Sequence, residues 1–331
     1  MSITPLNQLL HLLADGEFHS GTELGICLGI SRTAIWKQLC KLDKLGLKLH
    51  RVRGKGYRLS GGLDLLGVTA IRQQLSIAVD SHLKALQVII STNSTNQQLQ
   101  QQMQQYSVHG RAVIAELQTA GRGRRGRSWQ APFGKSISLS LGWSFAGGVA
   151  ELEGLSLTVG LAVITALEQL GLAKAELKWP NDILVEGHKL AGILLDMSGD
   201  AAGPCEVVIG IGLNVAQTQA DDLSIDQPWI SLKQLGLLVP RSTVAAALIS
   251  QLIVHLLDFQ KAGFVKFQNR WQAYHCYQDK LISLHLPNRI VTGICRGVNI
   301  SGALLLQQGS NMYTFNGGEV SIRANDSGMS V

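Results

Sequence analysis

Apolar residues recur with a helical period in the first sixty positions of the chain. Apolar side chains three or four positions apart predict helices over residues 6–15, 22–28 and 31–45. Thr22 is expected near the start of the second helix, Gly29 ends that helix, and Ser31 caps the third. A helix, a glycine-containing turn and a second helix are typical of a helix-turn-helix, so this region is predicted to be one.

The third predicted helix and the segment after it have an apolar side and a basic side. Ile35, Leu39 and Leu42 repeat at i, i+4 and i+7 and are expected to face inward. Two short alternating runs flank the turn 54–56 and indicate a β-hairpin wing. The outer helix face and the wing would contact DNA through Ser31, Arg32, Thr33, Trp36, Lys37, Arg51, Arg53 and Lys55.

Two alternatives to this interpretation stay open. Trp36 is bulky for contact with base edges, and it could instead pack inside the domain. The whole region could also be a small basic domain that binds a protein. Because one winged module binds DNA weakly, operator selectivity would require a homodimer on two half-sites.

The middle of the chain mixes strand-like and helix-like segments, which indicates an α/β (α+β) domain. Helices are predicted over 70–75, 97–106, 153–170, 243–259 and 264–274, and strands over 86–90, 111–117, 136–143, 177–185, 189–196 and 207–215. The glutamine-rich segment 97–106 is assigned to a helix because Leu99, Met103 and Tyr106 form a stripe. Pro180 interrupts the run 177–185, and a proline inside a strand marks an edge or a kink.

The last fifty residues return to strict alternation. Five short runs, separated by turns, predict a small antiparallel barrel with strands over 281–286, 290–295, 303–306, 311–315 and 319–323. No catalytic constellation is visible in this part. We expect it to pack and to assist the docking of a substrate.

Charge is concentrated in two places. The net charge of the chain is +6, and residues 1–60 hold nine Lys/Arg against four Asp/Glu, whereas the remaining 271 residues hold twenty against nineteen. Four of those twenty are arginines in the segment 121–127, Gly-Arg-Gly-Arg-Arg-Gly-Arg. Two concentrated cationic sites on an otherwise balanced chain predict two sites for anions.

Other features narrow the class of protein. The five cysteines are scattered and form no CxxC pair, which argues against a zinc site or a disulfide framework and fits a reducing, cytoplasmic location. The first residues lack the basic segment and cleavage-like site of a signal peptide. Polar residues interrupt the apolar run 243–259, which therefore predicts a packed helix and no membrane span.

The arginine-rich segment 121–127 lies between two predicted strands, so it is predicted to be a loop that binds an anion. Polar residues near predicted strand and helix ends could complete the site. Asn181 and Asp182 follow Pro180 and suit a Mg²⁺–phosphate group or a hydroxyl, although an ordinary turn is the alternative. Lys189 is either a solvated strand end or, next to an anion, an electrophile.

Three further segments could surround a ligand. The tripeptide Ser-Thr-Asn occurs twice, at 91–93 and 94–96, and only the second copy adjoins a predicted helix, which it would cap. Glycines 210 and 212 interrupt a buried strand, and such glycines often mark a close approach of the backbone to a ligand. The long polar segment 216–231 has the length of a lid.

The motifs GRGRRGRSW, KWPND, KLAGIL and GIGLN occur in this order, with a winged helix before them and GGEVSIR after them. Together they resemble the family of bifunctional biotin–protein ligases that also repress the biotin operon, and the resemblance covers essentially the whole chain. It implies a winged helix over residues 1–62, a catalytic domain like that of class II aminoacyl-tRNA synthetases over 67–275, and an SH3-like domain over 277–325.

The resemblance also implies a reaction and a set of site residues. Biotin and Mg-ATP would give biotinyl-5′-AMP, and a lysine of the biotin carboxyl carrier protein would then accept the biotin. Biotin would be held by Ser94, Thr95, Asn96 and Gln118, and its carboxylate and the forming phosphate by Arg122, Gly123, Arg124 and Lys189. ATP, the adenylate and Mg²⁺ would be placed by Arg124, Asn181, Asp182, Asn214 and Trp229, with Asp182 as the metal ligand.

The family has one Ser-Thr-Asn, whereas this chain has two, and we choose 94–96 because it adjoins the helix. The adenylate would act as corepressor: closing of the loop 121–127, expected to be disordered without ligand, would favour the operator-binding homodimer. A ligand-sensing transcription factor without catalysis and a lipoate-type ligase are the alternative functions.

Overall fold

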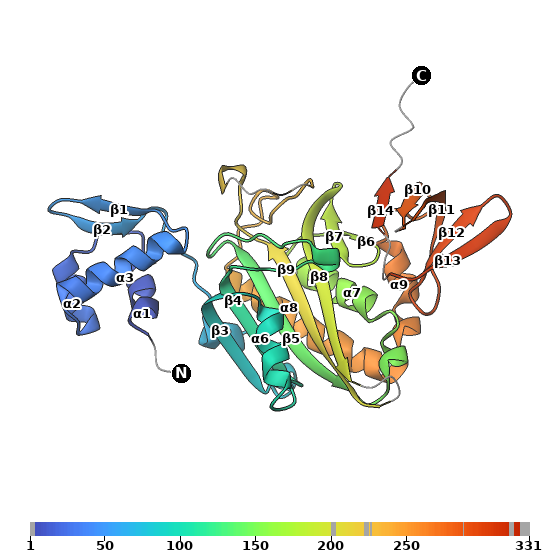
Figure 1. Cartoon of the computed structure of the whole chain (residues 1–331), viewed down its shortest axis with the longest axis horizontal. Helices are drawn as coiled ribbons and strands as arrows, with labels where there is room; N and C mark the ends of the chain where they lie inside the picture. Colours follow the sequence, from blue (N-terminus) through green and yellow to red (C-terminus); the bar gives the residue numbers. More distant parts are fainter. Residues whose placement is uncertain are drawn as a thin grey trace, which may run out of the picture.

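The computed structural model describes residues 4–199, 203–221, 225, 227–286 and 288–317, and the backbone of 321–324. Figure 1 shows three parts in chain order: a small helical domain with a hairpin, a central seven-stranded sheet with helices on both faces, and a C-terminal five-stranded sheet. The mixed α/β architecture expected from the sequence is confirmed. Residues Gly318–Val320 of the GGEVSIR motif lie outside the described residues, as do Asp222–Ser224 and Asp226 of the polar segment 216–231.

The N-terminal part consists of α1 (Pro5–Leu13), α2 (Gly21–Leu28), α3 (Arg32–Lys44) and the hairpin β1 (Leu49–Val52) and β2 (Gly56–Leu59). Ile35, Leu39 and Leu42 are buried, as their spacing predicts. Helix α2 begins at Gly21, so Thr22 lies near its start, as expected. Its N-cap is Ser20, whose hydroxyl accepts from the backbone of Glu23 while the Glu23 carboxylate accepts from that of Ser20. This reciprocal capping box satisfies two backbone donors.

The central sheet has the strand order β3-β4-β5-β9-β8-β7-β6. Its strands are β3 (Ala85–Thr92), β4 (Arg111–Gln118), β5 (Ser136–Phe145), β6 (Glu176–Lys178), β7 (Asp182–Val185), β8 (His188–Gly199) and β9 (Cys205–Asn214). Among the strands that the structure describes in this sheet, only β3 and β4 are parallel neighbours. Figure 1 shows α7 (Leu155–Gln169) and α8 (Arg241–Ala262) on one face and α6 (Thr95–Met103) on the other.

Side chains alternate along the strands, so that apolar residues pack on both faces of this sheet. Ile137, Leu139 and Leu141 of β5 are buried in the main core, which α7 and α8 share. Val113 and Val208 belong to a smaller cluster with Leu99 of α6. α8 is long and apolar enough to cross a membrane by length and composition alone, but 61% of its most apolar window is buried inside the fold. It is the core helix predicted from the sequence.

Several predicted elements change in the structure. The run 177–185 is no single strand: β6 and β7 form an antiparallel hairpin whose turn contains a cis Trp179–Pro180 bond. The helix predicted over 97–106 ends at Met103, and Tyr106 lies beyond it, 43% exposed. The helix predicted over 70–75 is the shorter α4 (Val68–Arg72), followed by α5 (Ile77–Asp80). The helix predicted over 264–274 is a 3₁₀ turn, 264–266, and the short α9 (Gln268–Ala273).

The C-terminal part is an antiparallel sheet with the order β13-β12-β11-β10-β14. Its strands are β10 (Leu281–His285), β11 (Ile290–Val298), β12 (Leu304–Gln308), β13 (Asn311–Phe315) and β14 (Ser321–Ala324). Besides packing, this part contacts residues of the KWPND and GRGRRGR motifs: the Nε1 of Trp179 donates to the Gly302 carbonyl at 3.0 Å, and Arg124 donates to the Gly317 carbonyl.

A buried polar cluster joins the N-terminal part to the central sheet. Arg241 and Glu116 form an ion pair at 2.6 Å, and both side chains are 1% exposed. The guanidinium also donates to the carbonyls of Asp64 and Ser136, and the Glu116 carboxylate accepts from the backbone of Leu66. The segment between the two domains is therefore bonded to the strands that flank the arginine-rich loop.

Candidate active site and DNA-binding face

A cavity lies over β8 and β9, on the side of the sheet that α6 covers. Four elements converge on it: the start of α6, the end of β4, the arginine-rich loop, and the β6–β7 turn. Its lining is Ser94, Thr95, Asn96, Gln118, Arg122, Gly123, Arg124, Trp129, Leu139, Asn181, Lys189, Gly192, Ile193, Leu194, Gly210, Ile211 and Gly212. The structure thus brings together all eight residues that the resemblance assigns to biotin, and Asn181 from those assigned to the nucleotide.

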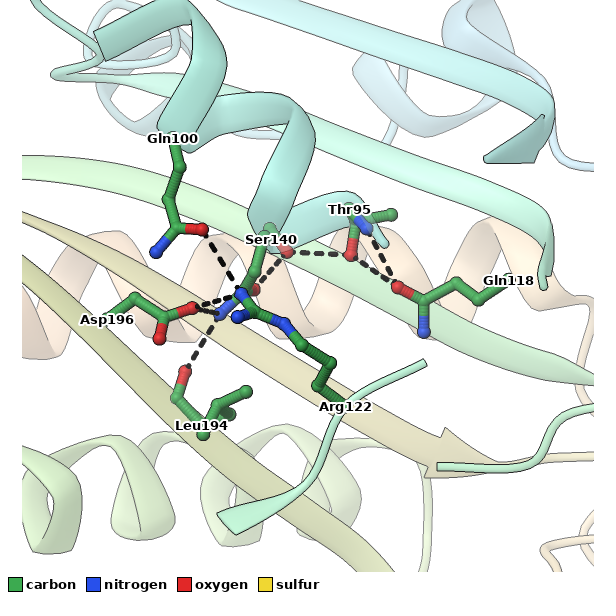
Figure 2. A network of polar contacts seen from close by, with 8 residues as sticks. Thr95, Gln100, Gln118, Arg122, Ser140, Leu194 and Asp196 are labelled. Carbon is green, nitrogen blue, oxygen red and sulfur yellow. Dashed lines mark hydrogen bonds and ion pairs between the residues drawn. The ribbon is translucent and has the colours of Figure 1, made fainter. Parts of the chain in front are cut away.

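One part of the cavity is uncharged and rich in hydrogen-bonding groups. Ser94, Thr95 and Asn96 are each 3% exposed, and the Ser140 hydroxyl lies within hydrogen-bond distance of Thr95 Oγ1 (2.7 Å) and Asn96 Oδ1 (2.5 Å). Gln118 accepts from the backbone and hydroxyl of Thr95. Figure 2 shows Thr95, Gln118 and Ser140 close together at the start of α6. Such a set suits a neutral polar ligand group.

The structure distinguishes the two Ser-Thr-Asn copies. The second lines the cavity, whereas Asn93 of the first accepts from the Thr119 hydroxyl outside it. The expected cap is wrong in one respect, because Ser94 occupies the N-cap position of α6 but makes no side-chain cap hydrogen bond. Its hydroxyl is therefore not committed to the helix end.

Gly210 and Gly212 make room for side chains of the site. A Cβ at Gly210 would lie 2.3 Å from Oδ1 of Asn96, and a Cβ at Gly212 would lie 2.3 Å from the indole of Trp129. The close approach that these glycines indicate in the sequence is therefore an approach of the protein's own cavity-lining side chains.

The other part of the cavity is cationic. The Nζ of Lys189 pairs with Asp182 at 2.8 Å, and Arg124 donates to Asn181 at 3.2 Å. Burial lowers the pKa of the Arg124 guanidinium from its ordinary value, and the nearby Asp182 carboxylate opposes this effect. Burial likewise lowers the pKa of Lys178, with Asp182 again opposing. Cations held out of water attract an anionic ligand more strongly than exposed ones.

The arginine-rich loop has a defined path. Gly123 N donates to the Arg127 carbonyl at 2.7 Å and Trp129 N to the Gly121 carbonyl at 2.8 Å, so the loop folds back on itself. A Cβ at Gly121 would lie 2.4 Å from the Trp129 carbonyl oxygen, which explains the glycine there. The expected disorder of the loop without ligand stays a prediction.

Three predicted nucleotide-site residues, Asp182, Asn214 and Trp229, do not line the cavity. Asn214 is 3% exposed and its amide donates to the carbonyls of Lys189 and Ile230. Trp229 forms a β-bridge with Lys189 beside the cavity. Asn214 thereby bonds the backbone of Lys189 and that of the neighbouring segment at Ile230, which helps to position the lysine.

The sequence interpretation missed several site residues. Trp129 lines the cavity, and the Nζ of Lys189 lies 5.8 Å from the centroid of its ring. The buried Nε1 of Trp129 has no hydrogen-bond partner among the described residues. Asp196 pairs with Arg122 at 2.9 Å, and Gln100 accepts from the same guanidinium. Trp129 belongs to the motif GRGRRGRSW, which the sequence analysis identified. The pairing of Asp196 with Arg122 spans 74 residues, and no local pattern indicates it.

The N-terminal part presents a separate basic surface. Ser31, Arg32, Thr33 and Lys37 are exposed on α3, and Ser31 also caps the helix at 3.2 Å to Ala34 N. Trp36 is 56% exposed, so packing inside the domain is not its role. Arg53 and Lys55 are exposed on the wing, whereas Arg51 is paired with Asp43 at 2.8 Å. A helix and a wing with exposed cations suit the backbone of DNA.

Comparison with known proteins agrees with this two-site arrangement. Family models match residues 5–58 as an HTH domain, 88–214 as the biotin/lipoate A/B protein ligase family, and 280–323 as the biotin protein ligase C-terminal domain. The class is therefore that of a biotin/lipoate-type ligase core joined to a DNA-binding domain.

Individual relatives narrow the class. The bifunctional ligase/repressor BirA of Escherichia coli K12 is 39% identical over 96% of this chain and 97% of its own length, and that of Bacillus spizizenii is 34% identical over 89% and 90%. A biotin protein ligase from Aquifex aeolicus in complex with biotin and ATP superimposes with a TM-score of 0.62 at 27% identity, over 73% of this chain and all of its own. The chain belongs to the family of bifunctional BirA ligase/repressors.

Proposed function

We propose that the chain joins biotin to ATP as biotinyl-5′-AMP and transfers the biotin to a lysine of the biotin carboxyl carrier protein. The observation that carries this proposal is the two-part cavity, in which buried neutral donors and acceptors lie directly beside Arg122, Arg124 and Lys189. Biotin has the same two parts, since its ring system is neutral and polar and its valeryl chain ends in a carboxylate.

The roles of the side chains follow from this division. Ser94, Thr95, Asn96 and Gln118 hold the polar groups of the biotin ring. A carboxylate oxygen attacks the α-phosphorus of ATP, the bond to pyrophosphate breaks, and Arg122, Arg124 and Lys189 stabilise the added negative charge, with the Gly123 backbone beside them. The carrier lysine then attacks the carbonyl carbon and AMP leaves.

ATP is placed by Arg124, Asn181 and Asp182, with Trp229 against the adenine and Asn214 beside it. Among the described residues no group of three or more His, Cys, Asp or Glu side chains could hold a metal ion by itself. A single carboxylate, Asp182, fits an ion that enters with the phosphates, since Mg²⁺ is usually bound by one or two carboxylates plus substrate oxygens. Bound there, Mg²⁺ neutralises phosphate charge.

The chain also acts as a repressor of biotin synthesis genes. The winged helix-turn-helix over residues 1–62 binds the biotin operator, and the adenylate formed in the domain 67–275 favours a homodimer that contacts two half-sites. The domain over 277–325 lies against the site and assists docking of the carrier protein. DNA and carrier protein as partners place this function in the cytoplasm.

The ligase function is tested by pyrophosphate release from the purified chain with ATP, Mg²⁺ and one of three acids: biotin, lipoate or octanoate. We expect release with biotin, and biotin on a recombinant carrier domain afterwards. Release with lipoate alone would identify the chain as a lipoate-type ligase, and no release with any acid would leave a ligand-sensing transcription factor. Unchanged affinity for operator DNA after adenylate formation would disprove the corepressor role.

A further inference from the structure

Asp196 is hydrogen-bonded to one residue from each part of the cavity, although it is not itself a lining residue. It stands on β8 opposite Val208 of β9, and its side chain is 21% exposed. One carboxylate oxygen, Oδ2, accepts from the Nη2 of Arg122 at 2.9 Å and from the Nδ2 of Asn96 at 2.8 Å. Figure 2 shows the Asp196 carboxylate beside the guanidinium of Arg122. A single acceptor thus connects a loop cation with a residue of the neutral part.

The carboxylate determines which way the Asn96 amide faces. Its Nδ2 is directed at Asp196 and at the Leu194 carbonyl (3.4 Å), two groups that only accept. The Oδ1 is therefore turned to Ser140, which donates to it at 2.5 Å. A carbonyl oxygen has a second lone pair, so Asn96 can present an acceptor to a ligand N–H.

The same carboxylate anchors the arginine-rich loop. Arg122 has two acceptors in the fold, Asp196 and the neutral Gln100 at 3.1 Å, and its side chain is 45% exposed. A hydrogen bond between two charged groups is stronger than one to a neutral amide. Asp196 is therefore the main attachment of this arginine beside the cavity.

We propose that Asp196 is a positioning residue that sets both parts of the site at once. It presents the Oδ1 of Asn96 to an N–H donor of the ligand, and it holds Arg122 where the ligand's carboxylate arrives. The ligand class is thus a molecule with an N–H donor at one end and a carboxylate at the other, joined by a chain. Its identification as biotin rests on the proposed function.

The decisive variant is Asp196→Asn, which keeps the size of the side chain and removes its charge. We expect the KM for biotin to rise about tenfold or more, the effect of losing a hydrogen bond to a charged acceptor, with a smaller change in kcat. Without any ligand, trypsin should cut the loop after Arg122, Arg124, Arg125 or Arg127 several times faster than in the parent chain. Asp196→Glu, which keeps the charge, should restore trypsin resistance in part.

Two further variants act as controls. Asp258→Asn removes a carboxylate from the ion pair with Lys266 on the surface of α8, and should change neither measurement. Gln100→Ala removes only the neutral acceptor of Arg122, and should speed trypsin cleavage and raise the KM for biotin less than Asp196→Asn does. Melting curves establish that each variant is folded.

Parental KM and parental trypsin resistance in folded Asp196→Asn would refute the proposal. If the KM of Asp196→Asn for biotin were no higher than that of the control Asp258→Asn, the proposed orientation of Asn96 would be refuted. If trypsin cut Asp196→Asn no faster than the parent, the anchoring of the loop would be refuted. If the parent chain does not use biotin, the proposed function fails, whereas the trypsin measurement still decides whether Asp196 anchors the loop.

Discussion

The winged helix and the central cavity both gather cations, but they hold them in different ways. Arg53 and Lys55 stand exposed on the wing, and the Arg51–Asp43 pair is half exposed on both sides. In the cavity, Lys189 and Asp182 are 16% and 18% exposed, and Arg124 is fixed by Asn181 and the Gly317 carbonyl. Exposed, mobile cations suit a long polyanion, whereas fixed and partly desolvated cations suit one small anion.

The largest expected effect concerns the buried cluster that connects the two regions. Arg241→Met should lower the free energy of unfolding by about 3–5 kcal/mol, because Glu116 is left as an uncompensated buried charge. Urea denaturation of the full chain measures it. Arg270→Met, which breaks a half-exposed pair with Glu168, should cost only about 0–1 kcal/mol. Equal effects of the two substitutions would contradict the importance of the buried pair.

A second prediction concerns the fixed cations of the cavity. Arg124→Ala should accelerate dissociation of the adenylate by about tenfold to a hundredfold, because a buried charged donor to the phosphate is lost. Release of labelled biotinyl-5′-AMP from preformed complex measures the rate. Arg125→Gln removes an equal charge from an exposed side chain outside the cavity lining and should leave the rate close to that of the parent. An unchanged rate for Arg124→Ala would remove this arginine from the site.

A third prediction compares the winged helix and the cavity by how strongly their functions depend on salt concentration. Arg53→Ala should reduce the slope of log K against log[salt] for DNA binding by about one unit per chain, while adenylate formation stays nearly insensitive to salt. Titrations between low and moderate salt measure both. Arg51→Ala should reduce the slope less, because that guanidinium already pairs with Asp43. A larger effect of Arg51 would mean that DNA displaces Asp43.

The smallest predicted effect tests what Trp36 contacts. Apolar side chains in a major groove recognise the methyl group of thymine. Trp36→Ala should weaken binding about fivefold to DNA selected from a randomised pool by the parent chain with biotin and ATP. Replacing thymine by deoxyuridine in that DNA should weaken the parent but not the variant. Equal loss for both would assign Trp36 to the sugar–phosphate backbone.

Features written in neighbouring residues could be predicted from the sequence. The spacing of Ile35, Leu39 and Leu42 gave the buried face of α3, and the run of arginines indicated the loop that contributes to the cavity lining. The capping box of α2 is likewise local, since Ser20 and Glu23 stand three residues apart, although the sequence interpretation did not identify it.

Features that depend on distant residues could not be predicted. Asp196 reaches Arg122 and Asn96 across 74 and 100 residues, and nothing near Asp196 marks it as part of a site. The contact of Gly317 with Arg124 likewise joins two domains.

The bonded segment between the first two domains has a consequence for DNA geometry. Leu66, Gly67 and Asp64 are hydrogen-bonded to Glu116, Ser242 and Arg241, respectively. The winged helix is therefore not connected through a flexible linker. In the proposed homodimer, the distance between the two recognition helices is therefore set by the position of the two catalytic domains. One base pair inserted between the half-sites would rotate one of them by about a tenth of a helical turn relative to the other. The two recognition helices could then not both contact their half-sites.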